Sequence, residues 1–333
     1  MIIDHLPLTM DHYRDVNVNG KWQLANGKWQ MNETPEETLR RLQWTVLKPL
    51  AAALGGNERS LVRASAADIT EVRAYQPGDD IRHIDWNISA RLDEPFVRES
   101  YEARALDVWL LVDVSPSVQW GTVKRLKIVH AIDFAVAAGY VLGRQGNRVG
   151  AMAFAQQPFR FVQPASGQRH WLRLIRELRE AAHEQLANRG QVGKTQLKLA
   201  LDEAARVIQS KSLVFVISDF LGPHDWTSAL RHLDHRHEVV AVRLLDPREE
   251  TLPDLGLLTF ADAETGQQLM VNTHDPKLRE RYQQAAQTRT QQLRKDIAVS
   301  GADLIELNTN EELLSVLTHF LGRRRLQRGA RAK

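Results

Sequence analysis

The sequence LDVWLLVDVSPS, residues 106–117, predicts both the fold of the chain and the place of a polar site. The part before Asp113 is a nearly continuous apolar run, which is typical of a strand buried on both faces of a parallel sheet. The run ends at Asp113, and Ser115 and Ser117 follow at alternate positions. We therefore expect oxygen-bearing side chains at one edge of a central sheet.

Similar apolar runs recur on both sides of segments with helical periodicity. Buried strands are predicted at residues 213–218 and 239–245, with a short last strand at 303–307. Two short strands, 149–154 and 159–162, are joined tightly enough to be antiparallel. Helices are predicted at residues 124–144, 171–182, 196–209, 225–233, 275–299 and 310–321. This alternation predicts an α/β fold with a doubly wound, mostly parallel, Rossmann-like sheet.

The chain divides into three parts by composition and pattern. Residues 1–104 hold an N-terminal arm, a helix and a β-rich region, residues 105–322 form the α/β domain, and residues 323–333 form a basic tail. The arm repeats NGKWQ, which favours a hairpin or an extended segment. Thr34, Pro35 and Glu37 form a capping box that begins a helix, which we expect to stop at Gly55-Gly56. The tail is interpreted as a frayed, solvated end rather than an anion or membrane contact.

Composition excludes several classes of function. The chain of 333 residues contains no Cys, so disulfides, thiolate metal sites and Cys nucleophiles are excluded. No apolar run approaches the roughly 18–20 residues that span a bilayer, and the first residues do not form a signal peptide. We therefore expect a cytoplasmic protein with no membrane span. Outside the basic tail the acids outnumber the bases, so a nucleic-acid partner is not expected.

The polar residues at the strand ends predict a metal site. In a doubly wound sheet of order 3-2-1-4-5-6, the strands that end at Asp113 and Asp219 are neighbours at the switch point. Thr195 begins the helix that leads into the second of these strands. An all-oxygen donor set favours a hard cation, Mg²⁺ first, with Mn²⁺ or Ca²⁺ possible. The predicted direct ligands are Asp113, Ser115, Ser117 and Thr195, with Asp219 as a near or water-mediated ligand. Helix capping by the first three remains an alternative.

Two motifs resemble known families. Asp113-x-Ser115-x-Ser117, together with Thr195 and Asp219, resembles the metal-ion-dependent adhesion site, or MIDAS, of von Willebrand factor A domains. Residues 73–86 read RAYQPGDDIRHIDW and are followed by SAR at 89–91, which resembles the signature of DUF58 proteins. The resemblance covers roughly residues 60–245.

The resemblance implies a non-enzymatic binding module with an open metal position that accepts an acidic side chain from a partner protein. DUF58 proteins resemble adaptors that accompany MoxR-type AAA+ ATPases. The partners implied are such an ATPase and a client protein that undergoes remodelling or maturation. Many relatives also carry membrane helices near the N-terminus, which this sequence lacks, so membrane attachment is not expected to carry over.

Three alternatives accompany this interpretation. Acids, hydroxyls and Mg²⁺ at strand ends could serve a phosphoryl-transfer hydrolase, although an aspartyl phosphatase of the Asp-x-Asp type would need an acid where Ser115 stands. Gly193-Lys194-Thr195 resembles the end of a phosphate-binding loop, but Asn188 stands where that loop requires Gly. The charged segment 73–91 is either a functional surface or a brace against the metal-bearing domain, and we favour the brace.

Overall fold

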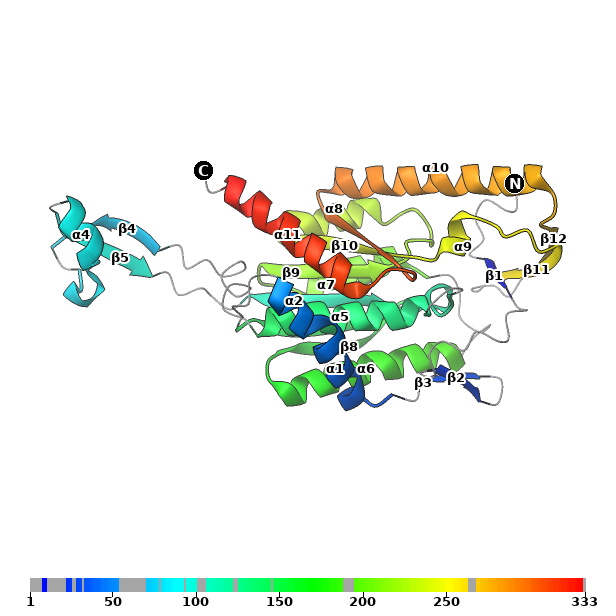
Figure 1. Ribbon diagram of the computed structural model, residues 1–333, viewed down its shortest axis with the longest axis horizontal. Helices are drawn as coiled ribbons and strands as arrows, with labels where there is room; N and C mark the ends of the chain where they lie inside the picture. The colour runs from blue at the N-terminus through cyan, green and yellow to red at the C-terminus, as the bar shows by residue number, and fades with distance from the viewer. Residues whose placement is uncertain are drawn as a thin grey trace.

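The computed structural model of the chain describes residues 8–10, 22–25, 28–31, 33–53, 70–77, 79–92, 94–100, 106–121, 125–144, 146–187, 195–262 and 268–331. A six-stranded sheet in the order β13-β10-β9-β6-β7-β8 forms its centre (Figure 1). Its strands are β6 (Asp107–Asp113), β7 (Arg148–Phe154), β8 (Pro158–Ala165), β9 (Ser212–Ser218), β10 (Glu238–Leu245) and β13 (Asp303–Asn308).

The topology of this sheet confirms the predicted α/β, doubly wound fold. β6 pairs in parallel with β7 and β9, and β10 pairs in parallel with β9 and β13. β8 is antiparallel to β7, as the short connection between them predicted. Counted along the chain from β6, the order is the predicted 3-2-1-4-5-6, so β6 and β9 meet at the switch point.

Helices cover both faces of the sheet and bury one apolar core on each. One core contains Val108, Leu110 and Val112 of β6, and the other contains Trp109 and Leu111, as the alternation of side chains along a strand requires. The first core is closed by α5 (Lys127–Gly143), α6 (Gln168–Ala187), α11 (Leu313–Arg331) and the N-terminal helix. The second is closed by α7 (Leu197–Val207), α8 (Thr227–Arg236) and α10 (Pro276–Ser300).

The N-terminal helix begins where its capping box predicted. In α1 (Pro35–Leu42), Thr34 Oγ1 accepts a hydrogen bond from Glu37 N, and Thr34 N donates to the Glu37 carboxylate. A π-helical turn, η2 (Gln43–Leu47), follows and leads into α2 (Lys48–Ala53). Arg41 donates to both oxygens of Asp133 on α5, at 2.8 and 2.7 Å, which ties this helix to the sheet domain. The expected stop at Gly55-Gly56 lies outside the described residues.

Smaller β-structures lie around the sheet. β2 (Trp22–Ala25) and β3 (Lys28–Met31) pair in antiparallel fashion, which confirms a hairpin at the NGKWQ repeat. β1 (Leu8–Met10), β11 (Leu257–Asp262) and β12 (Gln268–Asn272) form a three-stranded sheet close to α9 (Pro247–Glu250) (Figure 1). β11 pairs in antiparallel fashion with both β12 and β1. The sequence analysis did not predict β1, because three residues are too short to show a period.

Residues 70–100, which we call the signature module, form a separate small unit. It contains β4 (Thr70–Ala74), η3 (Ile81–His83), α4 (Trp86–Leu92) and β5 (Phe96–Ser100). The prediction of a β-rich region is wrong for the residues from Trp86 onward, because Asp85 caps a helix there by accepting from Asn87 N and Ile88 N. Figure 1 draws the signature module apart from the central sheet, and the interpretation as a brace stays a prediction.

The C-terminal end differs from the prediction as well. α11 continues to Arg331, past residue 321 where the closing helix was expected to stop, so the basic residues extend a helix instead of forming a frayed tail. Most residues of the extension are Arg, Leu, Gln or Ala, which are good helix formers and favour this continuation. Within the part of the chain that the structure describes, no helix is both long enough and apolar enough to cross a bilayer.

Candidate metal site at the carboxyl end of the sheet

The two predicted acids meet at the carboxyl ends of adjacent strands. Val112 of β6 is in register with Ile217 of β9, so Asp113 stands beside Ser218 and one residue from Asp219. Asp113 is fully buried and Asp219 is 3% exposed. Residues more than a hundred positions apart in sequence are therefore brought together by the strand order, as predicted.

Asp113 is held in place by uncharged donors. Its Oδ1 accepts from Ser115 N at 2.9 Å, and its Oδ2 accepts from Ser218 Oγ at 2.6 Å. The hydroxyls of Ser115 and Ser117 are 3.0 Å apart and both side chains are buried. One carboxylate and two hydroxyls thus lie at a single point, which is the arrangement that the metal-site prediction required.

Helix capping does not account for these residues. Ser115 precedes the single turn η4 (Pro116–Val118), but its side chain makes no capping hydrogen bond there. The long helix α5 begins only at Lys127 and is preceded by Leu126, which has no side-chain cap. The capping alternative therefore fails for Ser115 and for the helix that follows.

Thr195 lies at the same edge of the sheet. It is 4% exposed, and Gln196 N donates to Ala155 O just beyond β7. A Cβ atom on Gly222 would lie 2.8 Å from Thr195 O, so the backbone at Thr195 packs closely against the loop that follows Asp219. The sequence prediction thus placed all five residues at one end of the sheet, and the structure does the same.

Asp219 differs from the prediction because one of its two donors is a cation. Lys127 Nζ donates to Asp219 Oδ2 at 2.8 Å, and Leu221 N donates to Oδ1 at 3.1 Å. Between them Phe220 has φ +56°, a strained value for a bulky residue, and its ring packs edge-on against Trp226. The turn at Phe220 directs the backbone N–H of Leu221 at the carboxylate.

Lys127 also donates to a third acid. Its Nζ lies 2.6 Å from Glu249 Oε1 on α9, and the lysine side chain is fully buried. The other oxygen of Glu249 accepts from Asp246 N in the capping box of α9. Asp246 in turn accepts from Thr309 Oγ1 at 2.9 Å. A continuous chain of hydrogen bonds therefore links the end of β9 to the ends of β10 and β13.

The pKa values around this site are shifted by burial and by the charges of neighbouring side chains. Burial, together with the negative charge of Asp219, raises the pKa of Asp113 to about 7. Burial also raises the pKa of Glu249, against the opposing effect of Lys127. Burial lowers the pKa of Lys127, but Asp219 and Glu249 outweigh that effect and the net pKa is raised. The lysine stays charged and Asp113 lacks a cation of its own.

The residues around Asp113 fit a hard divalent cation. Asp219 and Glu249 share the ammonium of Lys127, whereas Asp113 on the neighbouring strand accepts hydrogen bonds from uncharged donors. The donors at Asp113 are all oxygen, the type that Mg²⁺ prefers. Among the residues that the structure places, no group of three or more His, Asp or Glu side chains is arranged to hold a metal. An ion at Asp113 would therefore depend on hydroxyls and water.

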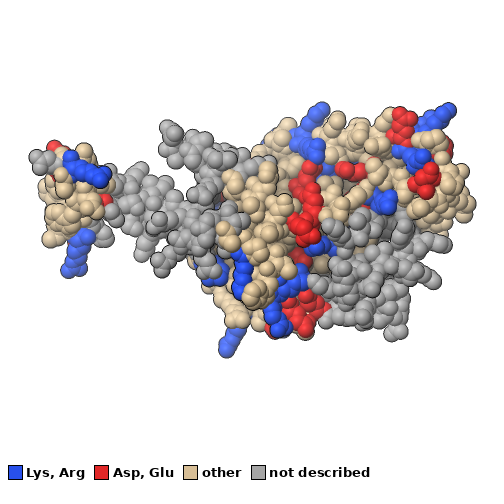
Figure 2. Space-filling model, in the orientation of Figure 1, with Lys and Arg blue, Asp and Glu red and all other residues tan. Residues whose placement is uncertain are grey.

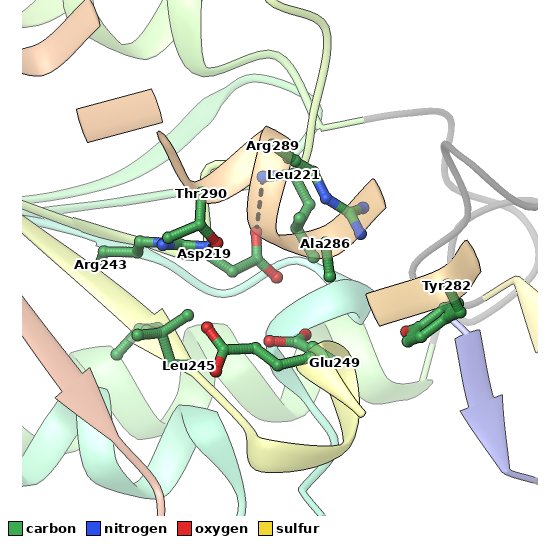
Figure 3. A pocket seen from close by; sticks show the side chains of 11 residues that line it. Asp219, Leu221, Arg243, Leu245, Glu249, Tyr282, Ala286, Arg289 and Thr290 are labelled. Carbon is green, nitrogen blue, oxygen red and sulfur yellow. Dashed lines mark hydrogen bonds between the residues drawn. The ribbon is translucent and has the colours of Figure 1, made fainter. Parts of the chain in front are cut away.

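A small pocket adjoins Asp219 and is lined by residues of β10, α9 and α10 (Figure 3). Asp219 and Glu249 point their carboxylates into it, and Arg243 and Tyr282 line its walls. Its cavity volume is about 20 Å³, which is close to what one water molecule occupies. The pocket is too small for an organic substrate.

Sequence reasoning missed Lys127, Glu249 and Ser218. Lys127 carried a usable signal, because it is a single charge in the otherwise apolar stretch LKIVHAI, and a buried lysine needs an acidic partner. Nothing local identified the partner, since Glu249 is 122 positions away. Ser218 directly precedes Asp219, but strand alternation alone does not indicate that its hydroxyl reaches across to Asp113.

Comparison with known proteins gives one family and several relatives. The family described as "Protein of unknown function DUF58" matches residues 71–292. The uncharacterized protein Rv1480 of Mycobacterium tuberculosis is 34% identical over 294 residues, which is 88% of this chain and 90% of the relative.

Two solved structures are similar at low sequence identity. The conserved hypothetical protein BatB from Bacteroides thetaiotaomicron has a TM-score of 0.44 and 14% identity, and covers 66% of this chain and 98% of its own. The SpRpn10 VWA domain has a TM-score of 0.35 and 10% identity, and covers 64% of this chain and 94% of its own.

Proposed function

This chain belongs to the DUF58 family, and we propose that it is a protein-binding module that acts through a divalent cation at the carboxyl end of its sheet. The cation is Mg²⁺ in the first instance, with Mn²⁺ or Ca²⁺ as substitutes. The residues proposed to hold it are Asp113, Ser115, Ser117 and Thr195.

The observation that carries the proposal is the state of Asp113. Its carboxyl is fully buried, its hydrogen-bond donors are uncharged, and a second acid stands on the neighbouring strand. A buried carboxylate is normally paired with a cation or coordinates a metal. The adjacent hydroxyls of Ser115 and Ser117 supply the further oxygens that a hard cation needs.

A partner protein would complete the site. Asp113 and the hydroxyls cannot fill the shell of a six-coordinate ion, and the remaining positions would be taken by water. An acidic side chain of a partner can replace one water and gain a strong charge–charge interaction where little solvent remains. The chain's own residues position the ion, and no bond of the partner is broken.

The partner that we propose is a AAA+ ATPase of the MoxR type, with this chain as its non-enzymatic, cytoplasmic adaptor toward a client protein. The support for this step is the DUF58 membership. Nucleic acid is not proposed as a partner. Figure 2 shows acidic and basic side chains interspersed on the face that it draws, without the broad basic surface that phosphate backbones require.

Metal binding is tested by calorimetric titration of the chelator-treated full chain with Mg²⁺ and Mn²⁺. We expect one ion per chain, and Asp113→Asn should abolish the heat of binding. Asp107→Asn is the matched control, because Asp107 begins the same strand and pairs with Arg148 at the opposite end. Equal binding by Asp113→Asn and the native chain would contradict the proposed site.

Partner binding is tested with a purified MoxR-type ATPase from the same source. We expect a complex on size-exclusion chromatography that forms in Mg²⁺ and dissociates in chelator or with Asp113→Asn. The alternative function, phosphoryl transfer, makes the opposite prediction. It requires Mg²⁺-dependent turnover of a generic phosphoester that Asp113→Asn removes, and such turnover would replace the adaptor proposal.

A further inference from the structure

The two acids at the carboxyl end of the sheet have different partners. Asp113 accepts hydrogen bonds from a backbone N–H and a hydroxyl, neither of which is charged. Asp219 instead accepts from the ammonium of Lys127 and from Leu221 N, so each of its oxygens has a donor. Both acids have a donor on each oxygen, but only the carboxylate of Asp219 already has its charge balanced by an ammonium, so it is the less suited of the two to ligate a second cation.

Lys127 is held firmly in this position. The residue is fully buried, its backbone N donates to Trp120 O at 2.9 Å, and its Nζ lies 5.1 Å from the centre of the Trp120 ring. It occupies the first turn of α5, where the helix dipole disfavours a positive charge. The two carboxylates that it contacts explain why a lysine is nevertheless found there.

We propose that Lys127 is a specificity-determining residue of the metal site, because its ammonium serves as the built-in cation of Asp219 and Glu249 and keeps both acids from ligating the metal. The metal part of this inference rests on the proposed function. A divalent ion is then held by Asp113 and hydroxyls, with Asp219 outside its shell. Such an ion keeps more of its positive charge for an acid from a partner.

Removing the ammonium should change the metal affinity in a defined direction. Without Lys127, the carboxylates of Asp219 and Glu249 face the same small space, which Arg243 and Arg289 also line, and they lose the cation that hydrogen-bonds to both of them (Figure 3). Two such acids attract a divalent ion. We expect Lys127→Met, which keeps most of the side-chain volume, to bind Mn²⁺ more than about tenfold more tightly than the native chain.

A double variant that conserves the net charge tests whether Asp219 is a metal ligand or only an acid neutralised by Lys127. Lys127→Met combined with Asp219→Asn removes one positive and one negative charge. If Asp219 lies outside the shell, the double variant should bind Mn²⁺ with an affinity within about threefold of the native chain. A loss of more than about tenfold would mean that Asp219 is a ligand and would overturn the inference.

The experiment is calorimetric titration of full-length variants with Mn²⁺ and Mg²⁺, with circular dichroism to verify folding. If variants at Lys127 do not fold, Asp219→Asn decides, because its amide oxygen still accepts from Lys127. A loss much smaller than that of Asp113→Asn supports the inference, and an equal loss overturns it.

Failure of the proposed function gives a different result. If the native chain binds no divalent ion, the proposed function fails by itself. In that case, a new Mn²⁺ isotherm for Lys127→Met still supports Lys127 as the built-in cation of the two acids. If Lys127→Met is folded and still gives no heat of Mn²⁺ binding, the role proposed for Lys127 is overturned.

Discussion

The site at the carboxyl end of the sheet and the signature module use charged residues in opposite ways. At the site, burial and a neighbouring acid raise the pKa of Asp113 to about 7. In the signature module, the hydrogen bond from Arg73 and that from Gln76 N lower the pKa of Asp79 to about 2. The first carboxyl lacks a cation in a dry environment, whereas the second has an arginine and solvent beside it.

The two regions also lie at opposite ends of one strand. The chain leaves the signature module at Ser100 and enters β6 at Asp107, and Asp113 is the last residue of that strand. Seven residues of strand separate the two ends by about 20 Å. The signature is the most specific motif in the sequence, yet it contributes no described side chain to the candidate site. A motif that is highly specific for a protein family therefore need not lie near that protein's candidate binding site.

The largest expected difference between the regions is in stability. Lys127→Met leaves two nearly buried carboxylates without their cation, which should lower the free energy of unfolding by about 3–5 kcal/mol. The matched change Arg73→Met should cost far less, because solvent screens the partly exposed Arg73–Asp79 pair. Urea unfolding followed by circular dichroism measures both. Equal losses would remove the distinction between the two regions.

Addition of metal should stabilise the sheet domain, which carries the candidate site, and not the signature module. At a free Mg²⁺ concentration about 100 times its dissociation constant, the native chain should gain about 2.7 kcal/mol, because the ion binds the folded state alone. The stabilisation should disappear with chelator and in Asp113→Asn, and should persist in Asp107→Asn. Thermal denaturation with and without Mg²⁺ measures it. Stabilisation of Asp113→Asn to the same extent would place the ion elsewhere.

The pH dependence of stability should depend on Asp113. Its folded pKa, about 7, lies above the unfolded value of 3.8, so the folded state holds the extra proton between these values. Without metal, the contribution of Asp113 to the free energy of unfolding is therefore fully present below the unfolded pKa and is lost as pH rises toward 7. The slope is at most about 1.4 kcal/mol per pH unit. Asp113→Asn should remove this component of a urea-unfolding series, and an unchanged pH profile would contradict the assignment.

The smallest effect is expected in the signature module. Trp86 is 71% exposed on α4, so Trp86→Ala should change the global free energy of unfolding by less than about 0.5 kcal/mol. Trp226 is 1% exposed and packs against Phe220, so it serves as the buried comparison. Trp226→Ala should lower the free energy of unfolding several times more than Trp86→Ala does. A large loss for Trp86→Ala would mean that the module packs against another part of the chain.

Most of the sheet could be predicted because its signals are local or follow a general rule. Apolar runs identified β6, β9 and β10, and the switch-point rule placed Asp113 beside the end of β9. The errors occurred where short-range patterns were ambiguous. Residues 86–92 alternate like a strand but follow the capping residue Asp85, and α11 continues past residue 321 although Gly322 is a typical signal for the end of a helix.

Periodicity, capping residues and the order of strands were sufficient to bring Asp113, Ser115, Ser117, Thr195 and Asp219 to one edge, because these features act over a few residues or obey a fixed handedness. The ion pairing of Asp219 required the folded chain. Lys127 and Glu249 belong to different elements, and the strength of their interaction depends on distance through a dry interior. Separation along the sequence carries no information about that distance, so only the packing of α5 against α9 and β9 determined which acid already has its cation and which does not.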